Sequence, residues 1–112
     1  MDPERARQLL AAERERIERE LDQLKRDASQ EAEDQSEPGG YDSENLYEEE
    51  LDTGLAEDLS EQLAAVDRAE ARMAEGVYGL SVDSGEPIPD ERLEAIPTAE
   101  RTVEEQERLG RS

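Results

Sequence analysis

A heptad repeat of apolar residues lies within the first third of the chain. Leu10, Ile17 and Leu24 recur every seven residues. This spacing puts apolar side chains on one narrow face of an α-helix, as in a coiled-coil seam. The Asp-Pro-Glu sequence at residues 2–4 is a favourable helix start. We therefore predict one long helix from there to about Glu33.

A second helix is predicted over residues 55–74, or 43–74 with an earlier start, because Leu59 and Val66 continue a similar seam. The Ser-Glu-Pro-Gly-Gly segment at residues 36–40 should end the first helix. Two helices of comparable length joined by a turn most simply form an antiparallel hairpin. The expected fold class is all-α, a long helical hairpin followed by a small C-terminal module and a short terminal helix.

The composition supports narrow helical seams and leaves little material for a broad core. Hydrophobic residues make up 33% of the chain, Phe and Trp are absent, and 41% of the residues are charged. This favours amphipathic helices, with disorder as the competing interpretation. The chain has no cysteine, so it can form neither a disulfide nor a thiolate metal site.

The negative charge is concentrated in the middle of the chain. The net charge is −20, and residues 31–62 carry thirteen acidic residues and no basic one. Such a field repels nucleic-acid phosphates and attracts basic surfaces. We therefore expect a protein partner and no direct nucleic-acid binding.

Several further expectations follow from residue types that are absent. There is no apolar run long enough for a signal peptide or a membrane span, so we expect a cytoplasmic chain without membrane association, acting as a monomer. With no histidine, no cysteine and few aromatic residues, nothing in the sequence would raise a carboxyl pKa for acid catalysis. We do not expect an enzyme.

Residues 76–106 contain a dense set of turn residues. The glycines at 76, 79 and 85 and the prolines at 87, 89 and 97 predict a compact series of tight turns without helix. Two pairs of polar residues stand within this segment, Ser81 with Ser84 and Thr102 with Glu105, and seventeen residues separate the pairs. This is the spacing of a four-cysteine zinc site. A last helix should begin near Thr102 and end at Gly110.

The turn segment also contains a specific pattern of glycine, aromatic and charged residues. Its members are Gly76, Tyr78, Gly79, Gly85, Ile88, the run Arg92-Leu93-Glu94-Ala95, and Pro97. With this pattern, residues 72–109 closely resemble the C-terminal zinc-finger region of the DksA/TraR family of bacterial RNA polymerase regulators. The resemblance covers about a third of the chain and implies a hairpin over residues 1–75 and a zinc-finger-like module over 76–112.

The resemblance places the four family cysteines at Ser81, Ser84, Thr102 and Glu105. Neutral hydroxyls are poor zinc ligands, so we expect a degenerate finger and no zinc cofactor. Hydrogen bonds that the hydroxyl oxygens accept from turn amides should then hold the module together. An apolar cluster should contribute as well, formed by Tyr78, Leu80, Val82, Ile88, Leu93, Ile96, Val103 and Leu109.

By resemblance, the chain binds RNA polymerase directly and inserts its acidic hairpin tip, residues 34–54, into the secondary channel to modulate initiation. The candidate partner-binding residues at this tip are Asp34, Glu37, Tyr41, Asp42 and Glu44. The alternative is that these residues only solvate a loop. Arg92 and Glu94 could form the framework of the module or contact the polymerase. The alternative function is an acidic interaction protein that docks on another basic surface or mimics nucleic acid.

Overall fold

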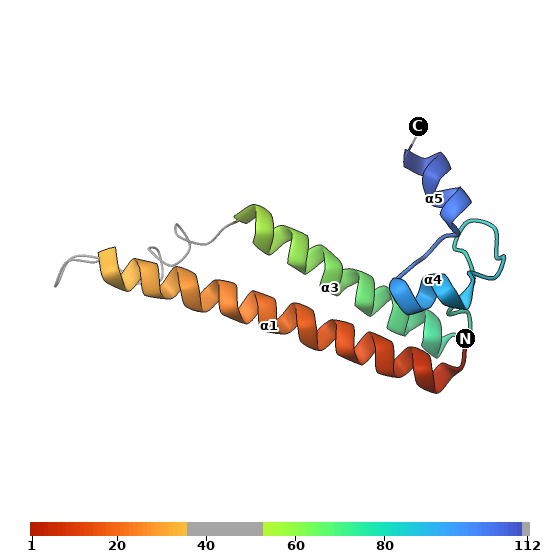
Figure 1. The fold of residues 1–112 in the computed structure, drawn as a ribbon, viewed down its shortest axis with the longest axis horizontal. Coiled ribbons are helices and arrows are strands. Elements are labelled where there is room, and N and C mark those ends of the chain that lie inside the picture. Colours follow the sequence, from red (N-terminus) through yellow and green to blue (C-terminus); the bar gives the residue numbers. More distant parts are fainter. Residues whose placement is uncertain (36–52, 111–112) are drawn as a thin grey trace. The chain divides into compact units, whose positions relative to one another are not determined.

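The computed structural model describes residues 1–35 and 53–110, and these are mainly helical (Figure 1). The described helices are α1 (Pro3–Gln35), α3 (Thr53–Ala74), α4 (Asp90–Ala95) and α5 (Val103–Gly110). Elsewhere, the described residues contain an isolated antiparallel bridge between Leu80 and Pro87 and no strand. The predicted all-α fold class is confirmed.

Helices α1 and α3 are the longest among the described residues, and neither is apolar throughout. α1 has 33 residues and α3 has 22, and charged side chains occur along both. In the part of the chain that the structure describes, no helix combines the length and apolar character that a membrane crossing requires.

The chain divides into two compact units, one formed by residues 15–63 and the other by 1–14 together with 64–112. In the first unit, Arg16 donates from Nη2 to Gln62 Oε1 at 2.9 Å, and Leu24 shares a surface groove with Leu55. Leu24 comes after Arg16 along α1, whereas its neighbour Leu55 comes before Gln62 along α3. The two helices therefore run antiparallel, as predicted. The buried apolar residues of this unit are Ile17, Ala28 and Leu59.

In the second unit, α1 and α3 are joined by apolar packing and by ion pairs. Arg14 of α1 forms an ion pair with Asp67 of α3, and its Nη2 lies 3.1 Å from Glu70 Oε2. These two carboxylates raise the pKa of Arg14, mainly through their hydrogen bonds. The residues of these two helices that are buried here are Ala6, Leu10, Val66 and Ala69.

The C-terminal module, residues 76–112, has a small apolar core, to which the N-terminal residue of the chain also contributes. Ile88, Leu93 and Ala99 are buried, and Met1 and Tyr78 pack against them. Two residues of the predicted apolar cluster are therefore buried and Tyr78 flanks them. The prediction is wrong for the other five, which are 37–51% exposed: Leu80, Val82, Ile96, Val103 and Leu109. Helix α5 places Glu105 on its buried side, and this leaves its apolar residues facing solvent.

A tight turn at Gly79 brings the chain back onto this core. Gly79 has a φ of 87°, in the left-handed region that favours glycine. Its carbonyl accepts a 2.7 Å hydrogen bond from the amide of Ile88. A Cβ at this position would lie 3.6 Å from Leu93 Cδ1. The turn therefore sets Ile88 and Leu93 side by side.

Helix α4 corrects the expectation that the turn segment contains no helix. Pro89 has an extended ψ of 141° at the N-cap, and its carbonyl accepts bonds from the amides of Arg92 and Leu93. Asp90 and Glu91 occupy the first turn, where negative charge complements the helix dipole. Pro97 disfavours helical geometry at the preceding residue and ends the helix. The prolines that suggested only turns thus delimit one short helix.

Candidate functional site

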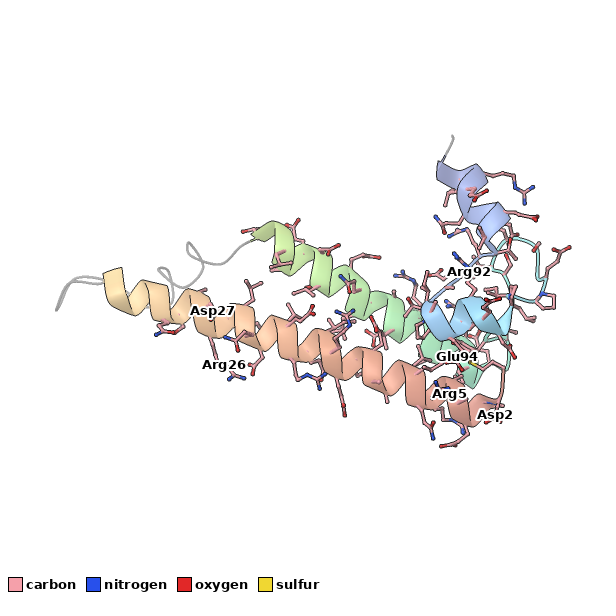
Figure 2. The ribbon with its side chains drawn as sticks, in the orientation of Figure 1. Asp2, Arg5, Arg26, Asp27, Arg92 and Glu94 are labelled. Atoms are coloured by element: carbon pink, nitrogen blue, oxygen red, sulfur yellow. The ribbon has the colours of Figure 1, made fainter. Side chains whose placement is uncertain are left out.

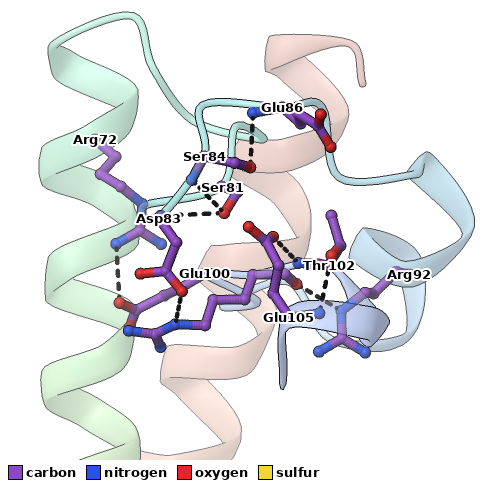
Figure 3. Close-up of polar contacts among 10 residues, drawn as sticks. Arg72, Ser81, Asp83, Ser84, Glu86, Arg92, Glu100, Thr102 and Glu105 are labelled. Carbon is purple, nitrogen blue, oxygen red and sulfur yellow. Dashed lines mark hydrogen bonds and ion pairs between the residues drawn. The ribbon is translucent and has the colours of Figure 1, made fainter. Parts of the chain in front are cut away.

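Thr102 and Glu105 form a reciprocal cap at the start of α5 (Figure 3). The backbone amide of Thr102 donates to Glu105 Oε1 at 2.9 Å, and the amide of Glu105 donates to Thr102 Oγ1 at 3.2 Å. This is a capping box, in which the residue before the helix and the third residue inside it satisfy each other's free amides. The x2 spacing that suggested a ligand pair therefore also fits a helix start.

Ser81 and Ser84 stabilise the turn that faces this helix. The Ser81 hydroxyl oxygen accepts hydrogen bonds from the amides of Asp83 and Ser84 at 3.1 and 3.3 Å, and Ser84 Oγ accepts from the amide of Glu86 at 3.2 Å (Figure 3). Ser81 is 5% exposed. The predicted bonding of these hydroxyls to turn amides is confirmed.

The Glu105 carboxylate connects the two pairs. It is 8% exposed, and its pKa is lowered from 4.5 to about 2, mainly by the backbone N–H of Thr102 and then by the hydroxyl of Ser81, with Ser84 adding a smaller effect. Each of these donors stabilises the ionised carboxylate. The four positions thus form one hydrogen-bonded cluster with a charged centre.

This cluster predicts an acid-dependent loss of stability. Because the folded-state pKa of Glu105 lies below 4.5, its contribution is fully present above that pH and is lost as the pH falls toward 2. Glu105→Gln keeps the acceptor oxygen but removes the charge. Its thermal unfolding midpoint should fall less steeply through this window than that of the unmodified chain. A Glu107→Gln variant, with the same change on an exposed residue of α5, is the control, and equal slopes for Glu105→Gln and the unmodified chain would contradict the prediction.

Arg92 and Glu94, the charged residues of the Arg-Leu-Glu-Ala run, make contacts within the chain. Arg92 donates from Nε to the carbonyl of Arg101 at 2.9 Å. Glu94 accepts two hydrogen bonds from Arg5 of α1, at 2.9 and 2.8 Å (Figure 2). Between them in sequence, Leu93 is fully buried. These contacts favour the framework interpretation of the run.

The segment from Pro97 to Thr102 is held along its length. The Tyr78 hydroxyl donates to the carbonyl of Pro97 at 2.7 Å, and the amide of Val82 donates to the carbonyl of Glu100 at 2.9 Å. Arg101 Nε lies 2.8 Å from Asp83 Oδ2 (Figure 3). These bonds fix the segment that leads into α5.

The predicted partner-binding tip can be located only in part. Asp34 belongs to α1, one residue before its end. Glu37, Tyr41, Asp42 and Glu44 lie outside the described residues, so their role stays a prediction.

Sequence reasoning missed Arg5 and Glu100 as residues that hold the module. Arg5 pairs with Glu94, 89 positions away, and Glu100 pairs with Arg68, 32 positions away. Neither Arg5 nor Arg68 belongs to a local sequence pattern that would predict its partner. Arg5 lies near the start of α1 and Arg68 near the end of α3, and acidic residues stand beside each of them.

Comparison with known proteins identifies the module and the fold. Residues 82–109 match the family described as the prokaryotic dksA/traR C4-type zinc finger. Over 46 residues, 41% of this chain, identity is 50% with General stress protein 16O of Bacillus subtilis and 48% with the RNA polymerase-binding transcription factor DksA of Caulobacter vibrioides. These matches span 28% and 32% of those two relatives.

One solved structure resembles nearly the whole chain. The transcription factor DksA2 from Pseudomonas aeruginosa superposes with a TM-score of 0.73 at 27% identity, over 97% of this chain and 83% of that protein. The likeness therefore extends beyond the C-terminal module to the helical hairpin.

The family match corrects the prediction that no cofactor is involved, because the matching family is described as a C4-type zinc finger. A C4 site requires four cysteine thiolates as zinc ligands. The chain has no cysteine to supply a C4 set, and the described residues contain no group of three or more His, Cys, Asp or Glu that could hold a metal ion. The side chains present do not match that ligand set.

Proposed function

We infer that this chain, which belongs to the DksA/TraR family, is a transcription regulator that binds RNA polymerase. The observation that carries the inference is the combination of a family match in the C-terminal module with a structural likeness to DksA2 along 97% of the chain. The Caulobacter vibrioides relative is named as an RNA polymerase-binding transcription factor. A shared module on a shared hairpin supports a shared partner.

The charge distribution supports an electrostatic mode of binding. Residues 31–62, which include the connection between α1 and α3, carry thirteen acidic residues and no basic one. A concentrated negative charge accelerates association with a basic surface and disfavours contact with nucleic acid. We propose that this acidic tip enters the secondary channel of the polymerase and modulates initiation by steric and electrostatic effects, without direct contact to DNA.

At residue level, the proposed contacts at the tip are Asp34, Glu37, Tyr41, Asp42 and Glu44. The C-terminal module would then support the hairpin rather than carry out chemistry, and we propose no enzymatic reaction. The proposed state of the free protein is a cytoplasmic monomer. The alternative, an acidic protein that docks on other basic surfaces, is favoured by the net charge of −20 alone.

Binding to purified core RNA polymerase tests this proposal. Neutralising the acidic residues between 42 and 50, by Asp42→Asn with Glu44, Glu48, Glu49 and Glu50→Gln, should lower the association rate about tenfold or more. The reason is that these changes remove much of the field that attracts a basic surface. Binding should also weaken with added salt, because the Debye length is only about 8 Å at physiological ionic strength. A known secondary-channel binder should compete with the unmodified chain.

The control keeps the total charge change and moves it elsewhere. In this control, five of the exposed glutamates outside the tip are changed to glutamine: Glu75, Glu86, Glu91, Glu104 and Glu107. This variant should bind nearly as the unmodified chain does. Equal losses in both variants would show that net charge alone drives association, and binding only to unrelated basic proteins would support the alternative function.

A further inference from the structure

Two carboxylates of the C-terminal module are each held by arginines of a different long helix. Glu94 binds Arg5 of α1 through two hydrogen bonds, Nε to Oε1 at 2.9 Å and Nη2 to Oε2 at 2.8 Å (Figure 2). Glu100 lies 3.0 Å from Arg68 Nε of α3. It also lies 3.9 Å from Arg72 Nη1 of the same helix (Figure 3). We call these five residues the arginine clamp. All of them belong to one compact unit.

The contact between Arg5 and Glu94 fixes an orientation. Two parallel bonds between a planar guanidinium and a carboxylate define both distance and angle, which a single point charge does not. The pKa of Glu94 is lowered, mainly by its hydrogen bond from Arg5. Both side chains are about half exposed, so solvent screening keeps the net stabilisation small. The contact therefore restricts geometry more than it adds stability.

The Glu100 side of the clamp is more enclosed. The Glu100 side chain is 21% exposed and that of Arg72 is 13% exposed. Arg72 Nη2 is buried and has no hydrogen-bond partner among the residues that the structure describes. The ion pair with Glu100 therefore balances a largely desolvated charge. The carbonyl of Glu100 also accepts from the amide of Val82 at 2.9 Å, so this residue is fixed through both its main chain and its side chain.

We propose that Glu94 and Glu100 are positioning residues, which hold the C-terminal module at one orientation against α1 and α3 and thereby orient the surface that the chain presents to its partner. Glu94 then acts within the molecule rather than as a polymerase contact. The orienting role concerns this chain alone. Its consequence for binding rests on the proposed function.

The orientation can be measured directly because the chain contains no cysteine. Gln8→Cys in α1 and Glu107→Cys in α5 are exposed positions in one unit, and they can carry a pair of spin labels. Pulsed electron paramagnetic resonance should give one narrow distance distribution for the otherwise unmodified chain. The double variant Glu94→Gln/Glu100→Gln should broaden it, since neutral amides cannot replace the three ion pairs that the two carboxylates form. An unchanged distribution in this double variant would overturn the proposal.

A charge exchange separates orientation from folding. Arg5→Glu alone should broaden the distribution, and Arg5→Glu with Glu94→Arg should narrow it again because the pair is re-formed with reversed charges. Glu91→Gln, on an exposed residue of the same short helix, should change nothing. If the Glu94/Glu100 double variant loses helix content by circular dichroism, the charge exchange decides the question alone. No recovery in the exchanged pair would then overturn the proposal.

The same variants, without labels, test the consequence for binding. The dissociation constant for core RNA polymerase should rise about tenfold in the Glu94/Glu100 double variant, within the range typical of coupling between distant sites, and should recover in the charge exchange. If the unmodified chain does not bind polymerase, the proposed function fails while the distance measurement still judges the clamp. If a variant with a broadened distribution binds as tightly as the unmodified chain, the positioning role in binding is overturned.

Discussion

Leu93→Ala is expected to destabilise the protein by about 2–5 kcal/mol, enough to unfold the C-terminal module. Leu93 is fully buried and forms the module core with Ile88 and Ala99. Removing its side chain leaves a cavity in a cluster too small to close over it. Urea unfolding followed by circular dichroism should show a lower midpoint, and hydrogen exchange at the amide of Ile88, which bonds to Gly79, should accelerate.

Leu109→Ala is the matched control, because it removes the same side chain from a position that is 51% exposed on α5. Its effect should stay within about 0.5 kcal/mol, as for most surface substitutions. A cost for Leu93→Ala that is no larger than for Leu109→Ala would contradict the assignment of Leu93 to the core.

Val66→Asp should have an effect of similar size on the long helices. Val66 is fully buried in α3, and a buried carboxylate without a partner costs about 3–5 kcal/mol. The loss of apolar packing at the same position adds to this cost. Circular dichroism at the helix band should show unfolding at a much lower urea concentration than for the unmodified chain.

Ala71→Asp provides the comparison for Val66→Asp, because it introduces the same carboxylate on an exposed position of the same helix. Only the difference in helix propensity should appear there, roughly 0.5 kcal/mol. Similar midpoints for the two variants would show that Val66 does not face the buried seam.

The long helices were predictable because their signal is local and periodic. Leu59 and Val66 of the predicted seam are buried in α3, and Leu10 and Ile17 are buried in α1. A seven-residue apolar repeat specifies which face of a helix is buried, independently of the partner that packs against it. The repeat was therefore sufficient to predict these buried residues. The helix limits differ from the prediction by two residues for α1 and for the start of α3, which is the usual uncertainty of helix ends.

The interior of the C-terminal module was only partly predictable. A hydroxyl often accepts a hydrogen bond from a backbone amide two or three residues away, as Ser81 Oγ does from the amide of Ser84. Such bonds follow from local turn chemistry. The apolar cluster was overestimated because turns and a polar cap, centred on Glu105, occupy much of the interior. Helix α4 was missed since its six residues are too few to show a period. The arginine clamp was missed because its partners come from distant parts of the sequence.

The separation of 89 positions between Arg5 and Glu94 also affects the order in which parts of the protein can fold during synthesis. At about 5–20 residues per second of synthesis, roughly 4–18 s pass between the two residues on the ribosome. During that interval the start of α1 lacks the carboxylate that holds it in the finished protein. The compact unit that contains the module therefore becomes complete late, because it is formed by an early and a late segment of the chain. Hairpin contacts between α1 and α3 can form before that.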